Sequence, residues 1–344
     1  MKDTTTNHAP ESADEIIRER RKRILNPRTV VFFALSAGLV YFLLRRIDLG
    51  ETARTFRDAD YRLLGLACVI YVFSNLFKSI RFAVLLKDLE VPQFKLFAIT
   101  SYHNFFNQIL PARTGELTFV YYLKKLAGAD ISRGLHALLV TRIFDFIIVA
   151  AFFVCSIIIH YGRQTSVALL AVGIGFLALS IVSLFYLKWI VILSRSVFER
   201  TMAVLRLREK SIVKKVLAKV IEVEDEFSGF DTKRFIPGLA FTSLLVWGAL
   251  YSMSFVTIHA FGVDINFMQS VAGATGAVLT NVLPINSFGS FGTLEVGWTG
   301  GFMLVGMGEQ DAITTGFGNH ILNFVAAAAI AIAGAIVLKV KNRK

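Results

Sequence analysis

Charged residues inside apolar runs are the part of this 344-residue sequence most able to do chemistry. Arg113 and Glu116 lie three residues apart in one such run, and Arg142 and Asp145 have the same spacing in another. Glu295 is an acidic residue within a third. A charged side chain at the centre of a bilayer costs about 3 kcal/mol on insertion scales, so each of these residues needs a partner or a ligand. The pattern therefore favours a site that binds a charged group in apolar surroundings.

Arg113 and Glu116 have two interpretations. They follow Pro111, where a short helix can begin with Thr114 as its cap. The free N–H groups at the start of that helix would attract a phosphate together with Arg113. The alternative is that Arg113 and Glu116 pair only with each other. We favour phosphate binding, because an isolated ion pair does not explain two charges in a broken segment.

The other charged residues leave more than one role open. Arg142 and Asp145 fit a buried ion pair that fixes one helix to its neighbour and, equally, a direct contact with a ligand. Lys78 and Arg81 are near the end of their run, where long side chains can extend to the interface or receive an anionic headgroup. Glu295 suits pairing with an arginine, binding of a cationic headgroup, or transfer of a proton.

The composition indicates which elements must position these residues. Hydrophobic residues make up 55% of the chain and its mean hydropathy is +0.60, which is far from a soluble domain. The net charge of +12 favours an anionic membrane surface over nucleic acid as a partner. Cys68 and Cys155 both lie in apolar runs, which excludes a disulfide framework. We therefore expect an integral membrane protein.

A bilayer core requires roughly 20 apolar residues in a helix. Six runs come close to or exceed this length: 29–44, 63–86, 135–159, 166–187, 236–261 and 312–338. They predict an all-α polytopic membrane protein, with a segment 1–28 before a single membrane domain 29–344. Flanking Lys and Arg residues place both termini in the cytoplasm, at the inner (plasma) membrane. The loop from Arg45 to Arg62 is an exception, because its five arginines fall on the predicted outer side.

Three further segments are not simple spans. Segment 188–235 is basic and has apolar residues at helical spacing, which predicts amphipathic helices on the inner leaflet. Segments 95–125 and 267–308 each begin and end on one predicted side and are broken by polar residues, Pro and Gly. We interpret these two as re-entrant helical hairpins, whose broken backbone must be enclosed by protein or by a wet cavity.

The two hairpins carry related motifs. One reads Asn107-Gln-Ile-Leu-Pro111 and the other Asn281-Val-Leu-Pro284. The surrounding halves, 62–160 and 236–338, would cross the membrane in opposite directions, and an inverted repeat of this kind points to the binding site of a transporter. Asn107, Asn281 and Asn286 suit contact with a headgroup, although closing the turns is their more ordinary role.

The sequence offers no cofactor site. His103 and His320 have no second ligand at metal spacing, and no Walker phosphate-binding loop is present. We therefore expect neither a bound metal nor ATP.

These motifs resemble a known family. The run from Asn107 to Glu116, then Thr141-Arg142-Ile-Phe-Asp145, then Pro284 to Glu295, resembles the flippase-like membrane family that includes the membrane domain of lysylphosphatidylglycerol synthases. The similarity extends from about residue 63 to 338, and Pro-x-Arg-x-Gly-Glu is its most specific element. The second turn reads Pro-Ile-Asn-Ser-Phe-Gly where the family has a denser Pro-Gly-Gly, and we expect the soluble synthase domain to be absent. The resemblance implies movement of a lipid rather than its synthesis.

We therefore expect translocation of a membrane lipid with an anionic, aminoacylated or glycosylated headgroup. One alternative is a membrane-embedded transferase with Glu116 or Glu295 as general base. Another is a non-catalytic membrane partner of a separate lipid synthase. Glycine-rich helices also leave a homodimer open. A transporter leaves the mass of the lipid unchanged, whereas a transferase changes it.

Overall fold

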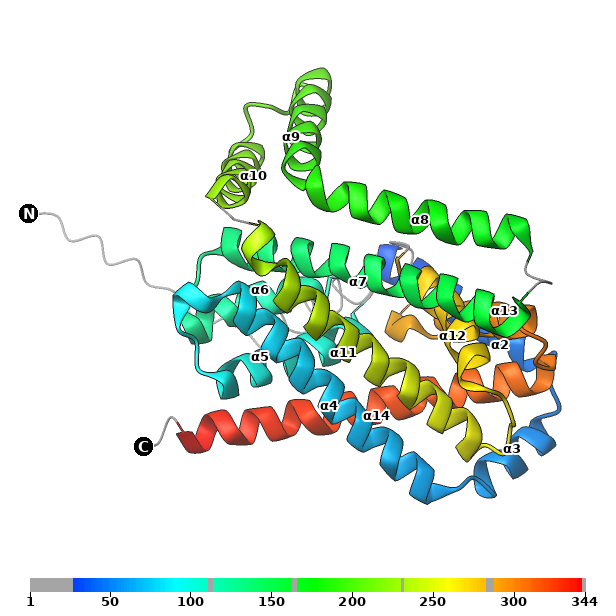
Figure 1. Ribbon diagram of the computed structural model, residues 1–344. Helices are drawn as coiled ribbons and strands as arrows, with labels where there is room; N and C mark the ends of the chain where they lie inside the picture. The colour runs from blue at the N-terminus through cyan, green and yellow to red at the C-terminus, as the bar shows by residue number, and fades with distance from the viewer. Residues whose placement is uncertain (1–26, 111–113, 163–165, 230–231, 283–287, 342–344) are drawn as a thin grey trace, which may run out of the picture.

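The computed structural model describes residues 27–110, 114–162, 166–229, 232–282 and 288–341. Throughout these ranges the ordered elements are helices and none is a strand, which confirms the all-α prediction (Figure 1). The α-helices are α2 (Pro27–Leu44), α3 (Leu49–Arg57), α4 (Tyr61–Leu85), α5 (Gln93–Ile109), α6 (Glu116–Ala127), α7 (Ile131–Tyr161), α8 (Val167–Phe185), α9 (Leu187–Val204), α10 (Ser211–Gly229), α11 (Thr232–Ala260), α12 (Phe267–Val282), α13 (Thr293–Leu304) and α14 (Glu309–Lys341). Two 3-10 turns, η1 (Lys87–Leu89) and η4 (Phe288–Ser290), complete the order.

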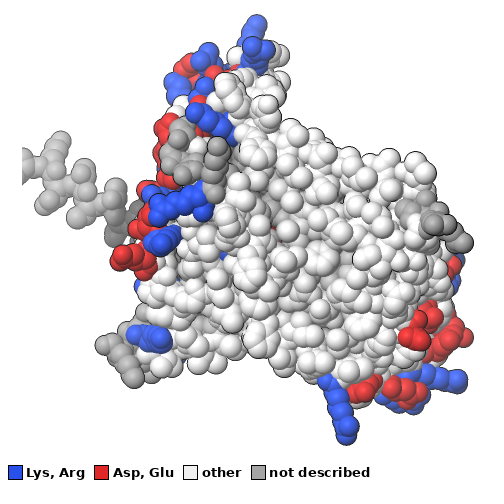
Figure 2. Space-filling model, in the orientation of Figure 1, with Lys and Arg blue, Asp and Glu red and all other residues white. Residues whose placement is uncertain are grey.

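Each of the six predicted apolar runs corresponds to one long helix. Five of these helices, α4, α7, α8, α11 and α14, are long and apolar enough to cross a membrane. The apolar stretch of α2, Phe33–Leu44, is shorter. On the face that Figure 2 shows, charged side chains gather at two opposite ends and the band between them is almost free of charge. Such a band suits the hydrocarbon core of a bilayer, so the chain is an integral membrane protein. The exact number of spans stays a prediction.

Segment 188–235 contains nearly all of α9, the whole of α10 and the start of α11, and α9 and α10 project from the body at the same end as the C-terminus (Figure 1). An ion pair of 2.7 Å between Arg195 and Glu224 joins the two helices. A second pair, Arg133 with Glu226 at 3.5 Å, joins α10 to α7. Trp189 on α9 is 64% exposed, which is typical of a helix whose apolar face meets lipid. Contact with the inner leaflet stays a prediction.

The arginine-bearing loop after α2 contains helix α3, which lies at the opposite end from α9 and α10 (Figure 1). Asp48 caps α3 by accepting hydrogen bonds from the N–H groups of Gly50 and Glu51. The hydrogen bond from Glu51 and, to a lesser extent, the one from Gly50 hold the pKa of Asp48 below its usual value. Arg46 pairs with Glu309 at the start of α14, with 3.1 Å between Nη1 and Oε1. The loop is therefore tied to α14.

Both predicted hairpin segments contain two helices, α5 with α6 and α12 with α13, and the helices of each pair pack together. The helix contacts of the two halves correspond. Helix α5 packs on α14 as α12 packs on α7, and α6 packs on α7 as α13 packs on α14. The first spans of the halves, α4 and α11, pack on each other. Pro111 and Pro284, which define the predicted breaks, lie outside the described residues.

Glycines allow α12 and α13 to approach closely. A Cβ atom added at Gly301 would lie 2.1 Å from the carbonyl oxygen of Gly273, and one at Gly276 would lie 2.4 Å from the carbonyl oxygen of Gly297. Both distances are far too short for non-bonded atoms. In contrast, a Cβ at Gly300, the next residue along α13, would meet no atom within 4 Å. The close packing of α12 on α13 therefore requires glycine on the side of α13 that faces α12.

We expect Gly301→Ala to lower the thermal stability of the detergent-solubilised protein, because the added methyl group forces the two backbones apart. Overpacking of this kind costs about 1–3 kcal/mol. Gly300→Ala is the matched control and should unfold at the wild-type temperature. The measurement is thermal unfolding followed by intrinsic fluorescence. Equal unfolding temperatures for the two variants would contradict the close packing of α12 on α13.

Candidate functional site

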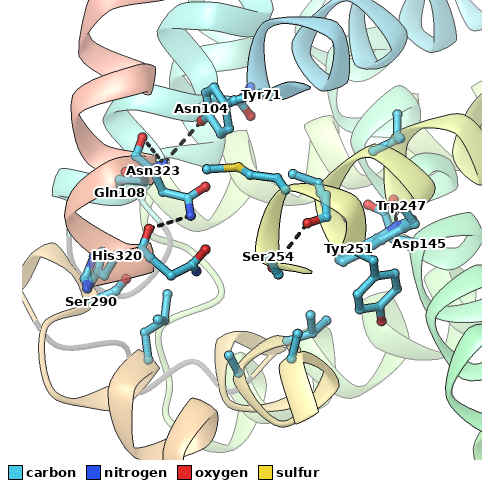
Figure 3. A pocket seen from close by; sticks show the side chains of 18 of the residues that line it. Tyr71, Asn104, Gln108, Asp145, Trp247, Tyr251, Ser254, Ser290, His320 and Asn323 are labelled. Carbon is cyan, nitrogen blue, oxygen red and sulfur yellow. Dashed lines mark hydrogen bonds between the residues drawn. The ribbon is translucent and has the colours of Figure 1, made fainter. Parts of the chain in front are cut away.

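A cavity of about 280 Å³ lies among the helices of both hairpins and the spans around them. Its lining comes from α4, α5, α7, α11, α12, α13 and α14, with Ser290 from η4. In Figure 3, Asn104, Gln108 and His320 stand on one side and Asp145 and Trp247 on the other. Small-molecule sites commonly measure about 300–1,000 Å³, so this volume suits a headgroup rather than a whole lipid.

Among the described residues near this cavity, Arg81 and Asp145 form the most buried ion pair that contains an arginine. Arg81 donates from Nη1 to Asp145 Oδ1 over 2.6 Å and to Ser243 Oγ over 3.0 Å. Trp247 donates from Nε1 to the same carboxylate oxygen over 2.8 Å. The side chain of Arg81 is only 4% exposed, so the predicted extension to the interface is wrong for this residue. The pair instead fixes α4 and α11 to α7.

Arg142 is bound mainly by a residue of the first hairpin. Its Nη2 donates to Glu116 Oε1 over 2.5 Å, whereas its Nη1 lies 4.0 Å from Asp145 Oδ2. The predicted pair within α7 is therefore the weaker contact, because the side chain of Asp145 turns toward Arg81. Arg142 lines the cavity and ties α7 to α6.

Helix α6 begins at Glu116 with Gly115 at its N-cap, so the prediction of Thr114 as the cap is wrong. The physical reason is close packing: a Cβ at Gly115 would lie 2.3 Å from the Cα of Asn107 on α5. Only glycine allows the turn to approach α5 this closely. Arg113, the predicted phosphate ligand, lies outside the described residues.

Lys78 lines the cavity instead of reaching the interface. Its Nζ donates to Asn104 Oδ1 over 3.3 Å, and within the described part of the chain it makes no ion pair. Of the carboxylates that the structure describes, Lys78, Arg81 and Arg142 have only two near them, those of Glu116 and Asp145. With every group in its usual charged form, this group of five residues, the cationic cluster, has one excess positive charge.

Glu295 is completely buried and does not meet an arginine among the described residues. Its Oε2 accepts the N–H of Gly292 over 2.7 Å, which caps α13, and its Oε1 lies 2.6 Å from His320 Nδ1 on α14. Glu116 and Glu295 hold equivalent places, because each binds the second helix of its hairpin to the following span. Their partners differ, Arg142 in one half and His320 in the other.

Several polar residues of the cavity were not predicted from the sequence. Asn107 lines the cavity, and its contact with a headgroup stays a prediction, while Asn286 and the side chain of Asn281 lie outside the described residues. Asn319 and Asn323 of α14 also line the cavity. They are four residues apart, and therefore on one face of an apolar helix, which is a signal that could have identified them.

The chain is similar to known membrane proteins. The pattern of the family described as the lysylphosphatidylglycerol synthase TM region matches residues 29–331. A UPF0104 membrane protein of Pyrococcus horikoshii is 25% identical over 309 residues, which cover 84% of this chain and 91% of the relative. One from Methanothermobacter thermautotrophicus is 25% identical over 344 residues, covering 94% and 96% of the two chains. The glycosyltransferase AglD of Haloferax volcanii is 30% identical over 145 residues, which are 40% of this chain and 23% of that protein.

Proposed function

The chain belongs to the family of lysylphosphatidylglycerol synthase transmembrane regions, and from this premise we propose that it translocates an anionic lipid between the leaflets of a membrane. The observation that carries the proposal is the 280 Å³ cavity beside the cationic cluster, within helices that form a membrane protein. A charged phosphate cannot cross hydrocarbon without a large desolvation cost. A cavity with excess positive charge lowers that cost while the acyl chains stay in the lipid.

The arrangement of the two halves supports this proposal. The corresponding contacts of α4–α7 and α11–α14 are those expected of an inverted repeat, in which two related halves enclose one site. In the proposed cycle, the two hairpins re-enter the membrane and the cavity opens to one leaflet at a time. The basic α9–α10 segment and the C-terminus would lie on the cytoplasmic side.

A transferase is the rival function, and the similarity to a glycosyltransferase over 145 residues is the observation in its favour. It needs a general base that can reach the substrate. Neither candidate carboxylate is suitable, since Glu116 is held by Arg142 and Glu295 by Gly292 and His320. Neither of these two carboxylates lines the cavity. The geometry therefore supports transport better than group transfer.

The test uses the purified full-length chain in liposomes that contain phosphatidylglycerol with a fluorescent acyl chain. We expect the protein to make the inner-leaflet lipid accessible to a membrane-impermeant quencher, and mass spectrometry should show the lipid unchanged. Liposomes with a heat-inactivated sample are the control. A changed lipid mass would favour the transferase. Accessibility equal to that of the control would contradict translocation and favour a non-catalytic partner of a lipid synthase.

A further inference from the structure

Among the described residues that line the cavity, four buried polar atoms have no hydrogen-bond partner. They are Asn107 Oδ1 and Gln108 Oε1 on α5, and Asn319 Oδ1 and His320 Nε2 on α14. Asn319 is 6% exposed and His320 is 1% exposed, so both are buried. A buried polar atom without a partner costs about 1–3 kcal/mol, and native proteins hold few of them. Four such atoms around one cavity indicate a polar ligand.

The chemistry of these atoms identifies groups that the ligand must carry. Three of the four are amide oxygens, which only accept hydrogen bonds, so the ligand must offer donors, as a hydroxyl group does. The imidazole Nε2 of His320 accepts or donates according to its tautomer. The four residues come from α5 and α14, two helices that pack together. In Figure 3, Gln108 and His320 lie across the cavity from Asp145 of the cationic cluster. The cavity therefore has a neutral, hydrogen-bonding side opposite Asp145, and Lys78 contacts this side through its hydrogen bond to Asn104.

The same lining is unsuited to a cationic headgroup. Asp145 is the only carboxylate among the described residues that line the cavity, and Arg81 and Trp247 already occupy it. An aminoacyl group would bring an ammonium into a cavity that already has excess positive charge, without an unoccupied carboxylate among the described lining residues to pair with it. Repulsion between like charges strongly disfavours the binding of such a headgroup in a buried site.

On the basis of the proposed translocation, we propose that this cavity recognises a phosphate that carries hydroxyl groups, as in a phosphoglycerol or phosphosugar headgroup, and disfavours aminoacylated headgroups. The cationic cluster binds the phosphate. The amides of Asn107, Gln108 and Asn319 and the imidazole of His320 bind the hydroxyl groups. The family takes its description from a lysylated lipid, whereas this lining favours the hydroxylated headgroup without the lysyl group.

The experiment measures binding of short-chain lipids to the full-length protein in detergent. Intrinsic fluorescence is a suitable signal, because two of the three tryptophans, Trp247 and Trp298, line the cavity. The probes are dihexanoyl forms of phosphatidylglycerol, phosphatidylinositol, phosphatidic acid, lysylphosphatidylglycerol and phosphatidylcholine. We expect the first two to bind at least tenfold more tightly than phosphatidic acid, and the lysyl form to bind more weakly than phosphatidylglycerol.

Two variants test the hydroxyl contacts. Asn319→Leu and, at a less buried position, Gln108→Leu should reduce the preference for phosphatidylglycerol over phosphatidic acid about tenfold, with phosphatidic acid binding unchanged. Gln269→Leu is the matched control, because this amide of α12 donates to Val305 and does not line the cavity. It should keep the preference.

The outcomes separate this inference from the proposed function. Equal binding of phosphatidylglycerol and phosphatidic acid by the wild type, or tighter binding of the lysyl form, would overturn the inference and leave translocation of anionic lipids standing. An unchanged preference in both leucine variants would also overturn it. If no anionic lipid binds more tightly than phosphatidylcholine, the proposed function itself fails.

Discussion

Replacement of Asp145 by alanine is expected to destabilise the folded protein by about 3–5 kcal/mol, which is the cost of removing one partner of a buried ion pair. The guanidinium of Arg81 would keep its charge in a 4% exposed position, with the hydroxyl of Ser243 as its remaining side-chain partner. The indole N–H of Trp247 would lose its acceptor as well. Because Asp145 is bonded to both α4 and α11, the loss affects the packing at the centre of the two halves.

Thermal unfolding of the purified protein in detergent measures this effect. Glu226→Ala is the control, because its pair with Arg133 is partly exposed and such pairs contribute at most about 1 kcal/mol. A double variant, Arg81→Met with Asp145→Leu, should recover most of the lost stability, since an apolar replacement of both charges is often neutral. Wild-type stability of Asp145→Ala alone would show that Arg81 does not depend on this carboxylate.

The helices were predictable because hydropathy is a local property. Runs of apolar residues identified α4, α7, α8, α11 and α14, and polar residues with Pro and Gly marked the segments that contain α5–α6 and α12–α13. The prediction of the N-cap of α6 was wrong because a contact with a distant part of the chain determines it. Sequence preference favoured Thr114, whereas contact with α5 requires Gly115 to be at the turn.

The charged residues of the site were predictable, but their partners were not. Spacing along one helix suggested Arg142 with Asp145, because only neighbours three or four residues apart can be paired from sequence. The actual partners are distant in the chain: Arg81 lies 64 residues from Asp145, and Arg142 lies 26 residues from Glu116. These pairs depend on which helices pack together, and hydropathy does not contain that information.

Apart from Asn107, the neutral side of the cavity was missed for a different reason. An asparagine or glutamine in an apolar helix has no charge to balance, so Gln108, Asn319 and Asn323 gave a weaker signal than the charged residues did. That they line one cavity becomes visible only when α5 and α14, from different halves of the chain, are found side by side.

Replacement of Lys78 by glutamine is expected to slow translocation of phosphatidylglycerol at least tenfold with little change in stability. The substitution removes the excess positive charge of the cationic cluster, so a phosphate in the cavity loses its net attraction. Two unit charges 4 Å apart interact by about 4 kcal/mol at an effective dielectric constant of 20, and a tenfold effect corresponds to about 1.4 kcal/mol of this. Stability should be nearly unchanged, because the hydrogen bond from Lys78 to Asn104 is long, at 3.3 Å.

The liposome assay with fluorescent phosphatidylglycerol measures the rate, and thermal unfolding of the same sample measures the stability. Lys78→Arg keeps the charge and should retain most of the rate. Lys95→Gln removes a lysine whose amine donates to the carbonyl oxygen of Leu126 and does not line the cavity, so it should transport like the wild type. A wild-type rate for Lys78→Gln would mean that the excess charge of the cluster does not act on the lipid. Loss of rate in Lys78→Gln together with an intact fold would assign that charge to transport rather than to folding. Arg81 and Arg142 already have carboxylate partners, so the charge of Lys78 is the one available to a phosphate.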